Sequence, residues 1–221
     1  MARMNFRELL AHMVWPASCP VCGAMGRLLC GECLRSLLKP QLPRCLACGK
    51  VIPCGPHTSA AKIHAASAYA GDMREIILML KHWGCEAIGF QIGQACAEIF
   101  PRPASGLPDV LVPVPLHEKS RRRYNQALAI AEGLGRAWGV EVRSAARWMS
   151  DVKTRAGMSA AERRSLSSDV FEFDGALAGL RVGLVDDVCT TGSTLSRLAA
   201  AAERAKIEVT GAFVAAAAVA R

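Results

Sequence analysis

The stretch VGLVDDVCTTGSTL, from Val182 to Leu195, decides how the rest of the chain is interpreted. Its first residues, with the two before them, read LRVGLV, which is typical of a parallel strand covered on both faces. Asp186 and Asp187 follow at the place where an α/β sheet positions its ligands, the carboxyl end of a strand. The small residues after them open a predicted helix, LSRLAAAAERA. The stretch therefore predicts a strand, a ligand-binding loop and a helix in that order.

The loop after the acids has the composition of a phosphate site. It combines hydroxyl groups, backbone N–H groups and one glycine at a helix N-terminus, where unpaired N–H donors and the helix dipole favour an anion. Its residues are Thr190, Thr191, Gly192, Ser193 and Thr194. The two carboxylates before it suit sugar hydroxyls or Mg²⁺, so the implied ligand is a sugar phosphate. The alternative is a strand end followed by an ordinary helix cap.

As a whole, this run resembles the ribose 5-phosphate and diphosphate binding signature of type I phosphoribosyltransferases. The resemblance implies that Asp186 and Asp187 hold the ribose 2′ and 3′ hydroxyls and that the loop Thr190–Thr194 holds the 5′-phosphate. Dinucleotide and nucleoside triphosphate loops are excluded, because neither G-x-G-x-x-G nor G-x-x-x-x-G-K occurs in the sequence.

Eight of the potential metal ligands in the amino-terminal part form four pairs, each with two intervening residues. They are Cys19 with Cys22, Cys30 with Cys33, Cys45 with Cys48, and Cys54 with His57. This spacing lets two side chains meet one tetrahedral Zn²⁺, and eight ligands fill two closed sites, which indicates structural zinc. A disulfide framework or a redox Cys-x-x-Cys motif is less consistent with the repeated pairs. Short gaps favour two consecutive ribbons over an interleaved arrangement, and His64 is an alternative to His57.

Composition limits the class of protein. With 221 residues, 52% of them hydrophobic, the chain has room for a moderate domain and an appendage. The first residues, MARMNFRELLAHMVWP, lack the apolar core of a secretion signal, and no apolar run reaches the roughly 20 residues of a transmembrane helix. We therefore expect a cytoplasmic protein without a transmembrane segment, whose cysteines bind metal. A break near Pro53 and Pro56 predicts the end of the zinc-binding part, giving a double zinc ribbon domain at 1–62 and a second domain at 63–221, which the resemblance implies is a type I phosphoribosyltransferase domain.

Positive charge is concentrated in the middle of the chain. The formal net charge is +8, and the span from Lys119 to Arg164 holds eleven Lys or Arg against four Asp or Glu. Arg121, Arg122 and Arg123 follow a predicted strand, DVLVPVPL, and should reach the same sheet edge as the acids, where they would bind diphosphate. The basic segment 151–165 is a candidate cover over the bound phosphates. The alternative for all of these residues is a solvated basic face.

The other segments alternate between strand and helix patterns. Strands are predicted at AASAYAG, VEVRSAARW and EVTGAFVAAAAVAR, and helices at residues 5–14, at 73–83 with Asp72 as its cap, at 86–100 and at 127–138. This order predicts an α/β fold with a parallel sheet of about five strands flanked by helices, preceded by a zinc-ribbon domain. The resemblance of the Val182–Leu195 stretch implies that this sheet is phosphoribosyltransferase-like.

The combination resembles the ComF family of competence-associated bacterial proteins. The resemblance rests on the Cys pairs, LKHWG (80–84), VPVPL (112–116) with RRRYNQA (121–127), and VDDVCTTGST (185–194). The sequence departs from the family's usual Arg-Gly-Phe-Asn-Gln by lacking the glycine, and it has Cys54-x-x-His57 where many members have Cys-x-x-Cys. The resemblance implies a role in DNA uptake, with single-stranded DNA and the competence machinery as partners.

Two functions follow as hypotheses. In the first, the protein transfers a phosphoribosyl group from phosphoribosyl diphosphate to an acceptor that the sequence does not indicate. Asp186, Asp187 and Arg121 to Arg123 would then form the catalytic centre, with Mg²⁺ held mainly by diphosphate and ribose oxygens. In the second, the same fold is a non-catalytic module that senses a ligand or binds single-stranded DNA through its basic residues and zinc ribbons.

Overall fold

The computed structural model describes residues 18–57, 61–102, 106–117, 119–120, 122–149 and 170–219. Three predictions lie outside these ranges: the helix at 5–14, the placement of Arg121, and the phosphate cover at 151–165.

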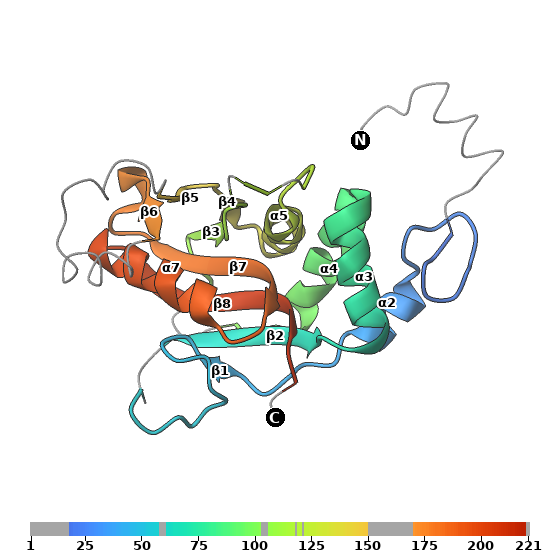
Figure 1. Cartoon of the computed structure of the whole chain (residues 1–221), viewed down its shortest axis with the longest axis horizontal. Helices are drawn as coiled ribbons and strands as arrows, with labels where there is room; N and C mark the ends of the chain where they lie inside the picture. The colour runs from blue at the N-terminus through green and yellow to red at the C-terminus, as the bar shows by residue number, and fades with distance from the viewer. Residues whose placement is uncertain are drawn as a thin grey trace.

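The described residues form a mixed α/β fold with a mostly parallel sheet flanked by helices (Figure 1). The strands are β1 (Arg44–Cys45), β2 (Lys62–Ala68), β3 (Val110–Pro113), β4 (Glu141–Val142), β5 (Ala146–Trp148), β6 (Phe171–Phe173), β7 (Arg181–Cys189) and β8 (Glu208–Ala217). The helices are α2 (Gly31–Leu37), α3 (Gly71–Trp83), α4 (Glu86–Ile99), α5 (Gln126–Trp138), the 3₁₀ turn η1 (Gly175–Leu177) and α7 (Ser193–Arg204).

The main sheet has the strand order β1-β2-β8-β7-β3-β4. The strands from β2 to β4 in this order are mutually parallel, which confirms the predicted five-stranded parallel sheet. A sixth strand was not predicted. It is β1, from the zinc-ribbon region, and it pairs antiparallel with β2 at Arg44 and Ile63.

Both faces of the sheet are buried, because neighbouring residues on each strand pack into different cores. On β8, Phe213 packs with α3, α4 and α5, whereas Ala212 and Val214 pack with α7 and the two-stranded β5–β6 sheet. Figure 1 shows α7 lying across one face of the sheet. This double coverage explains why the strands contain nearly continuous apolar residues.

Close helix packing fixes the start of α5, which carries site residues. A Cβ atom on Gly93 of α4 would lie 2.0 Å from Ile130 O of α5, and one on Gly133 of α5 would lie 2.0 Å from Phe90 O of α4. The absence of both side chains lets the two backbones touch, so α4 holds α5 at a defined depth against the sheet.

Three local predictions need correction. Strand β7 continues to Cys189, so Asp186 and Asp187 lie within the strand instead of after it. The segment VEVRSAARW forms two strands in different sheets, because β4 joins the main sheet while β5 pairs with β6. Helix α3 begins at Gly71 with Ala70 as its N-cap, so Asp72 lies in the first turn and does not cap the helix.

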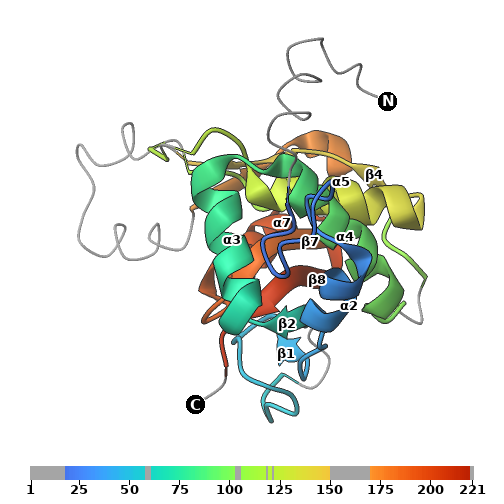
Figure 2. The same cartoon turned by 90° about the vertical axis from the view of Figure 1, so that its right-hand side faces the viewer.

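The zinc-ribbon region packs directly on the α/β region. Leu29 and Leu37 belong to the same buried cluster as Ile76, Leu80 and Ile92 of α3 and α4. Figure 2 shows α2 beside α4, with β1 next to β2 below them. The predicted boundary between 62 and 63 falls at the start of β2.

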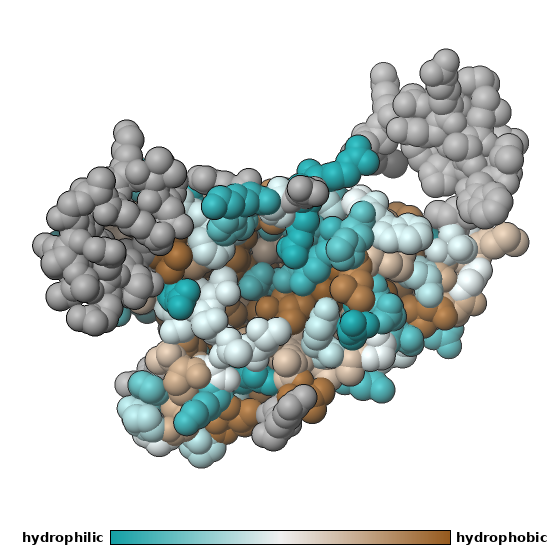
Figure 3. All heavy atoms as spheres, in the orientation of Figure 1, coloured by the Kyte–Doolittle hydropathy of each residue, from teal (hydrophilic) through white to brown (hydrophobic). Residues whose placement is uncertain are grey.

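The described surface of the molecule is mixed in character. In the space-filling view of Figure 3, hydrophobic residues lie among hydrophilic ones over this face. Of the described helices, none is both long enough and apolar enough to cross a membrane.

Candidate functional site

A cavity of about 310 Å³ lies at the carboxyl ends of β3 and β7. It is the position at which open α/β sheets bind their ligands. The side chains with polar groups that line it are Lys81, His117, Ser120, Arg122, Asn125, Gln126, Trp148, Asp186, Asp187 and Thr194. The cavity therefore brings both predicted acids together with one of the three predicted arginines and one residue of the predicted phosphate loop.

The acids form a compact pair at the end of β7. Asp187 is buried, with 8% of its surface exposed, and its backbone N–H donates to Asp186 Oδ1 at 2.8 Å. Burial, and then the negative charge of Asp187, raise the pKa of Asp186 well above its ordinary value. Two carboxylates held this close need a cation or hydroxyl donors to stay ionised together.

Part of that charge is balanced by Lys81, at the carboxyl-terminal end of α3. Its Nζ lies 3.0 Å from Asp187 Oδ2, and the two side chains are only 17% and 11% exposed. Lys81 is not among the site residues predicted from the sequence. Its position in LKHWG, one turn before the glycine that ends α3, was the available signal.

The phosphate loop turns sharply between β7 and α7. Gly192 has a left-handed backbone (φ 80°) and is the N-cap of α7, with no side-chain cap among the described residues. Thr191 Oγ1 donates to Ser193 Oγ at 3.0 Å and accepts a longer bond, 3.4 Å, from Ser193 N–H. Within the predicted loop, Thr194 faces the cavity, while Thr190, Thr191, Gly192 and Ser193 are not among its lining residues.

The predicted arginines diverge. Arg122 lines the cavity, and its Nη1 donates to Gln126 Oε1 at 3.1 Å. Arg123 instead lines a separate groove of about 760 Å³, together with Trp83 and Tyr124. Adjacent residues in the RRRYNQA segment therefore serve different surfaces.

Two amides of the same segment hold the site together from inside. Asn125 caps α5 by accepting from Ala127 N–H at 3.0 Å and donates to Val114 O at 2.9 Å. The buried Gln126 donates to Leu80 O at 3.3 Å, next to Lys81. These bonds tie α5 to β3 and α3, so they set the distance between Arg122 and the acid pair.

An aromatic wall completes the cavity, and the sequence analysis did not predict it. The rings of His117 and Trp148 are 4.9 Å apart, and Trp148 Nε1 donates to Pro115 O at 2.8 Å. Trp148 comes from β5 of the two-stranded β5–β6 sheet, whose pairing no local sequence pattern indicates.

The eight predicted metal ligands gather into two clusters with consecutive grouping. One holds Cys19, Cys22, Cys30 and Cys33, and the other holds Cys45, Cys48, Cys54 and His57, with ligand atoms within 4.8 Å of one another. The Cys22–Cys30 Sγ separation is 3.7 Å, close to the roughly 3.8 Å expected between two sulfurs on a tetrahedral Zn²⁺. The Cys54 Sγ–His57 Nδ1 separation is also 3.7 Å, near the roughly 3.5 Å expected between a sulfur and a nitrogen on such an ion. His64 is not in either cluster; its ring stacks on Phe213.

Comparisons with known proteins agree with this organisation. The family model for the double zinc ribbon domain matches residues 10–68. Together with the two ligand clusters, it identifies the amino-terminal region as a double zinc ribbon with structural Zn²⁺.

Relatives match a larger part of the chain. The DNA utilization protein YhgH of Salmonella typhimurium (strain LT2) is 28% identical over 194 residues, which are 82% of each chain. YhgH of Escherichia coli (strain K12) is 27% identical over 194 residues, 82% of this chain and 75% of that protein. Competence protein F of Haemophilus influenzae is 35% identical over 98 residues, 42% of this chain and 43% of that protein.

Among solved structures, the allosteric regulatory enzyme of purine biosynthesis matches with a TM-score of 0.41 and 21% identity. The glutamine phosphoribosylpyrophosphate amidotransferase of B. subtilis gives the same values. These matches cover 58% of this chain and about a quarter of either enzyme.

Proposed function

The chain belongs to the ComF family, and from this premise we propose that its cavity binds phosphoribosyl diphosphate together with Mg²⁺. The observation that carries the proposal is the acid pair, partly buried Asp186 and buried Asp187, which lines one cavity with Thr194 and two cations, Lys81 and Arg122, the first of them in contact with Asp187. A ribose that carries a diol, a phosphate on one side and a diphosphate on the other matches this set of acidic, hydroxyl and basic groups.

Each part of the ligand has a matching group. The ribose 2′ and 3′ hydroxyls donate to the carboxylates of Asp186 and Asp187. The 5′-phosphate accepts from backbone N–H groups of Thr190–Thr194 at the start of α7, where the N-cap residue Gly192 has no side chain to occupy them. Arg122 and Lys81 neutralise the diphosphate. Arg122 is poised for this by its bond to the rigidly held Gln126.

The donor set also fits Mg²⁺. Asp187 Oδ2 is buried and, among the described residues, has no polar partner apart from the ammonium of Lys81, 3.0 Å away. Mg²⁺ in phosphate sites is typically held by one or two carboxylates, with the remaining positions filled by phosphate oxygens and water. Asp186 and Asp187 would supply the protein's share, and the bound ion would neutralise charge on the diphosphate.

We further propose a role in natural competence and DNA uptake in bacteria. The support comes from the relatives, whose names describe DNA utilization and competence. In this role the ribose phosphate site would serve either phosphoribosyl transfer or ligand sensing.

Calorimetry with a series of sugars in Mg²⁺ buffer tests the site. Wild-type protein should bind phosphoribosyl diphosphate and ribose 5-phosphate, whereas 2-deoxyribose 5-phosphate should bind about 10- to 100-fold more weakly, since one hydrogen bond to a charged group contributes roughly 1.5–3 kcal/mol. Of Asp186→Asn and Asp187→Asn, the variant that removes the acceptor of the 2-hydroxyl should bind the two sugars alike.

The control is Asp72→Asn, an exposed carboxylate in the first turn of α3, which should keep the full discrimination. Absence of binding by the wild type, or equal discrimination in both acid variants, would contradict the proposed ribose site.

A second candidate, single-stranded DNA binding, is favoured by the groove beside the cavity. Trp83 is 77% exposed there, and Arg123 and Tyr124 line the same groove. Exposed aromatic rings stack on bases and arginines pair with phosphates, the combination used by sequence-tolerant single-strand binders.

Fluorescence anisotropy with an oligothymidine tests this candidate. Trp83→Ala should weaken binding by about 5- to 150-fold, the equivalent of roughly 1–3 kcal/mol for one stacked base. Arg123→Ala should reduce the slope of log K against log [salt] by roughly 0.7. Arg147, an exposed arginine on β5 paired with Glu172, is the matched control. Equal slopes for both arginine variants would remove the groove from consideration.

A further inference from the structure

The second zinc ribbon touches the phosphate loop at backbone distance. Gly49 directly follows the Cys45–Cys48 pair, and a Cβ atom placed on it would lie 1.9 Å from Thr191 O and 2.9 Å from Thr191 C. In return, a Cβ on Gly192 would lie 2.9 Å from Gly49 Cα. Only glycines allow the two turns to approach this closely, since real Cβ atoms do not occur at such distances.

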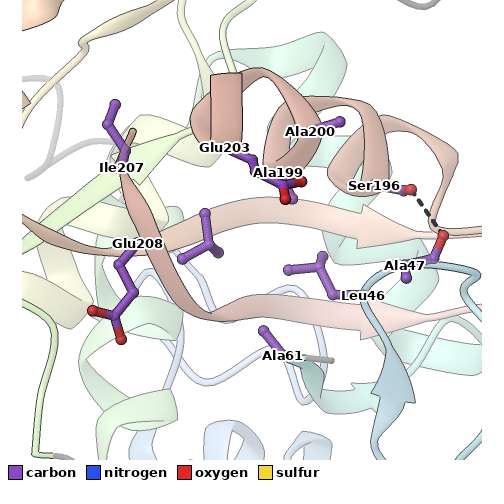
Figure 4. Close-up of a pocket in the computed structure, with 10 residues that line it drawn as sticks. Leu46, Ala47, Ala61, Ser196, Ala199, Ala200, Glu203, Ile207 and Glu208 are labelled. Carbon is purple, nitrogen blue, oxygen red and sulfur yellow. Dashed lines mark hydrogen bonds between the residues drawn. The ribbon is translucent and has the colours of Figure 1, made fainter. Parts of the chain in front are cut away.

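Hydrogen bonds join the same two segments. Arg44 Nη1 donates to Thr190 O at 3.1 Å, and its Nη2 donates to Ala218 O. Ser196 Oγ, one turn into α7, donates to Ala47 O at 3.0 Å, the dashed line in Figure 4. The ribbon therefore contacts the loop, the first turn of α7 and the segment after β8.

The zinc ligands belong to the turn that makes these contacts. Gly49 N–H donates to Cys45 O at 2.7 Å and Cys45 N–H to Lys50 O at 2.8 Å, which closes the turn 45–50. The side chains of Cys45 and Cys48 lie in the second ligand cluster. The conformation of the turn 45–50 therefore determines both the second metal site and the surface that contacts the phosphate loop.

The contacts orient the loop's amides. In a trans peptide the C=O of one residue and the N–H of the next point in opposite directions. Because the carbonyls of Thr190 and Thr191 meet the ribbon, the N–H groups of Thr191 and Gly192 point away from it. We infer that the turn 45–50 of the second zinc ribbon positions the phosphate loop, with Arg44 and Gly49 as positioning residues for the ribose phosphate site. This inference rests on the proposed function of that loop.

The chain offers a matched pair of variants to test it. Gly23 and Gly49 each follow a Cys-x-x-Cys pair, with φ of 74° and 71°, but a Cβ on Gly23 has no atom within 4 Å. Gly49→Ala and Gly23→Ala therefore share the same backbone strain, and only the first pushes on the loop. Calorimetry with ribose 5-phosphate should show about 10- to 100-fold weaker binding by Gly49→Ala, equal to one lost amide–phosphate bond, and unchanged binding by Gly23→Ala.

Hydrogen–deuterium exchange on the ligand-free protein gives a readout that does not depend on the proposed ligand. Peptides covering residues 190–196 should exchange faster in Gly49→Ala than in Gly23→Ala. If the wild type binds no ribose phosphate, the proposed function fails, and the exchange result alone decides whether the ribbon positions the loop. Equal exchange, or wild-type binding by Gly49→Ala, would overturn the inference.

Elemental analysis must show that Gly49→Ala keeps two zinc ions per chain. If it loses one, Arg44→Met decides instead, because this variant removes the bonds to Thr190 O and Ala218 O but keeps the backbone bonds that close the turn. Arg44→Met should bind ribose 5-phosphate roughly 2- to 12-fold more weakly, the value of one ordinary hydrogen bond, with faster exchange at 190–196. Unchanged exchange in this variant would equally overturn the inference.

Discussion

Asp186→Asn should make the ligand-free protein more stable, whereas Asp187→Asn should make it less stable, although the two residues are adjacent. Burial and the charge of Asp187 both oppose ionisation of Asp186. The neutral asparagine side chain removes the repulsion between the two carboxylates and keeps an oxygen that accepts from Asp187 N–H. A gain of about 1 kcal/mol in the free energy of unfolding is typical of such relief at a functional site. Urea denaturation at pH 7 measures it.

Asp187→Asn removes the partner of a mostly buried lysine. Breaking a fully buried ion pair costs about 3–5 kcal/mol. Here Lys81 and Asp187 are 17% and 11% exposed, and Asp186 remains nearby, so we expect a loss of about 1–3 kcal/mol. Asp72→Asn, on an exposed position, should change stability by less than about 0.5 kcal/mol. A loss of stability in both acid variants would show that the pair is a structural strand end.

The pH dependence of the free energy of unfolding distinguishes charge repulsion within the acid pair from a change in packing. A carboxyl group whose pKa is raised on folding contributes stability that is fully present below its unfolded pKa, about 3.9, and that is lost as the pH rises through the folded pKa. The wild type should therefore lose stability as the pH rises above about 4, and Asp186→Asn should lack that component. Parallel stability curves for the two proteins would contradict the raised pKa.

Bound ligand should reverse the order of stability of the wild type and Asp186→Asn. A ligand present at 100 times its Kd stabilises the folded state by about 2.7 kcal/mol. Mg²⁺ and phosphoribosyl diphosphate should thus stabilise the wild type well beyond Asp186→Asn, because the variant lacks a ribose acceptor. The wild-type carboxylate would then be retained because it binds the ligand, although it lowers the stability of the ligand-free protein.

The features that could be predicted from the sequence are those set by residues close together in the chain. Cys-x-x-Cys spacing places two ligands on one turn, so the four pairs and their consecutive grouping followed from the chain itself. Continuous apolar runs identified the parallel strands, and the acid pair comes directly after the apolar run of β7, inside the strand. These features involve residues that are close in sequence, where spacing fixes geometry.

The remaining parts of the site depend on contacts between distant segments. The Lys81–Asp187 pair requires the depth of α3 against β7, which is set by core packing. Arg122 and Arg123 differ in direction because Asn125 caps α5 and fixes the turn before it. The approach of Gly49 to Thr191 requires β1 to join the sheet, and a two-residue strand has no pattern that sequence can reveal.

Zinc removal should have the largest effect on stability, and the two sites should respond differently. In the first site, Cys19, Cys30 and Cys33 are 1%, 9% and 8% exposed and belong to the core cluster that contains Leu80 and Ile92. Cys22 is the one exposed ligand of that site. In the second site Cys45 is buried, whereas Cys48 and Cys54 are only partly buried. A thiol reagent with a colorimetric zinc indicator should therefore release two zinc ions per chain in two phases, the second-ribbon ion first.

Loss of the zinc ion of the first ribbon should coincide with unfolding. Structural zinc contributes an apparent free energy of about 10–16 kcal/mol in isolated zinc-finger peptides, as much as the whole stability of a typical domain. Cys33→Ser should accordingly leave little folded protein by circular dichroism, because the first ribbon and α3–α4 share one core. Cys54→Ser, its counterpart in the second site, should leave one zinc ion and a folded chain with faster exchange at residues 190–196. A Cys33→Ser protein that melts at the wild-type temperature would show that the first ribbon does not support the α/β core.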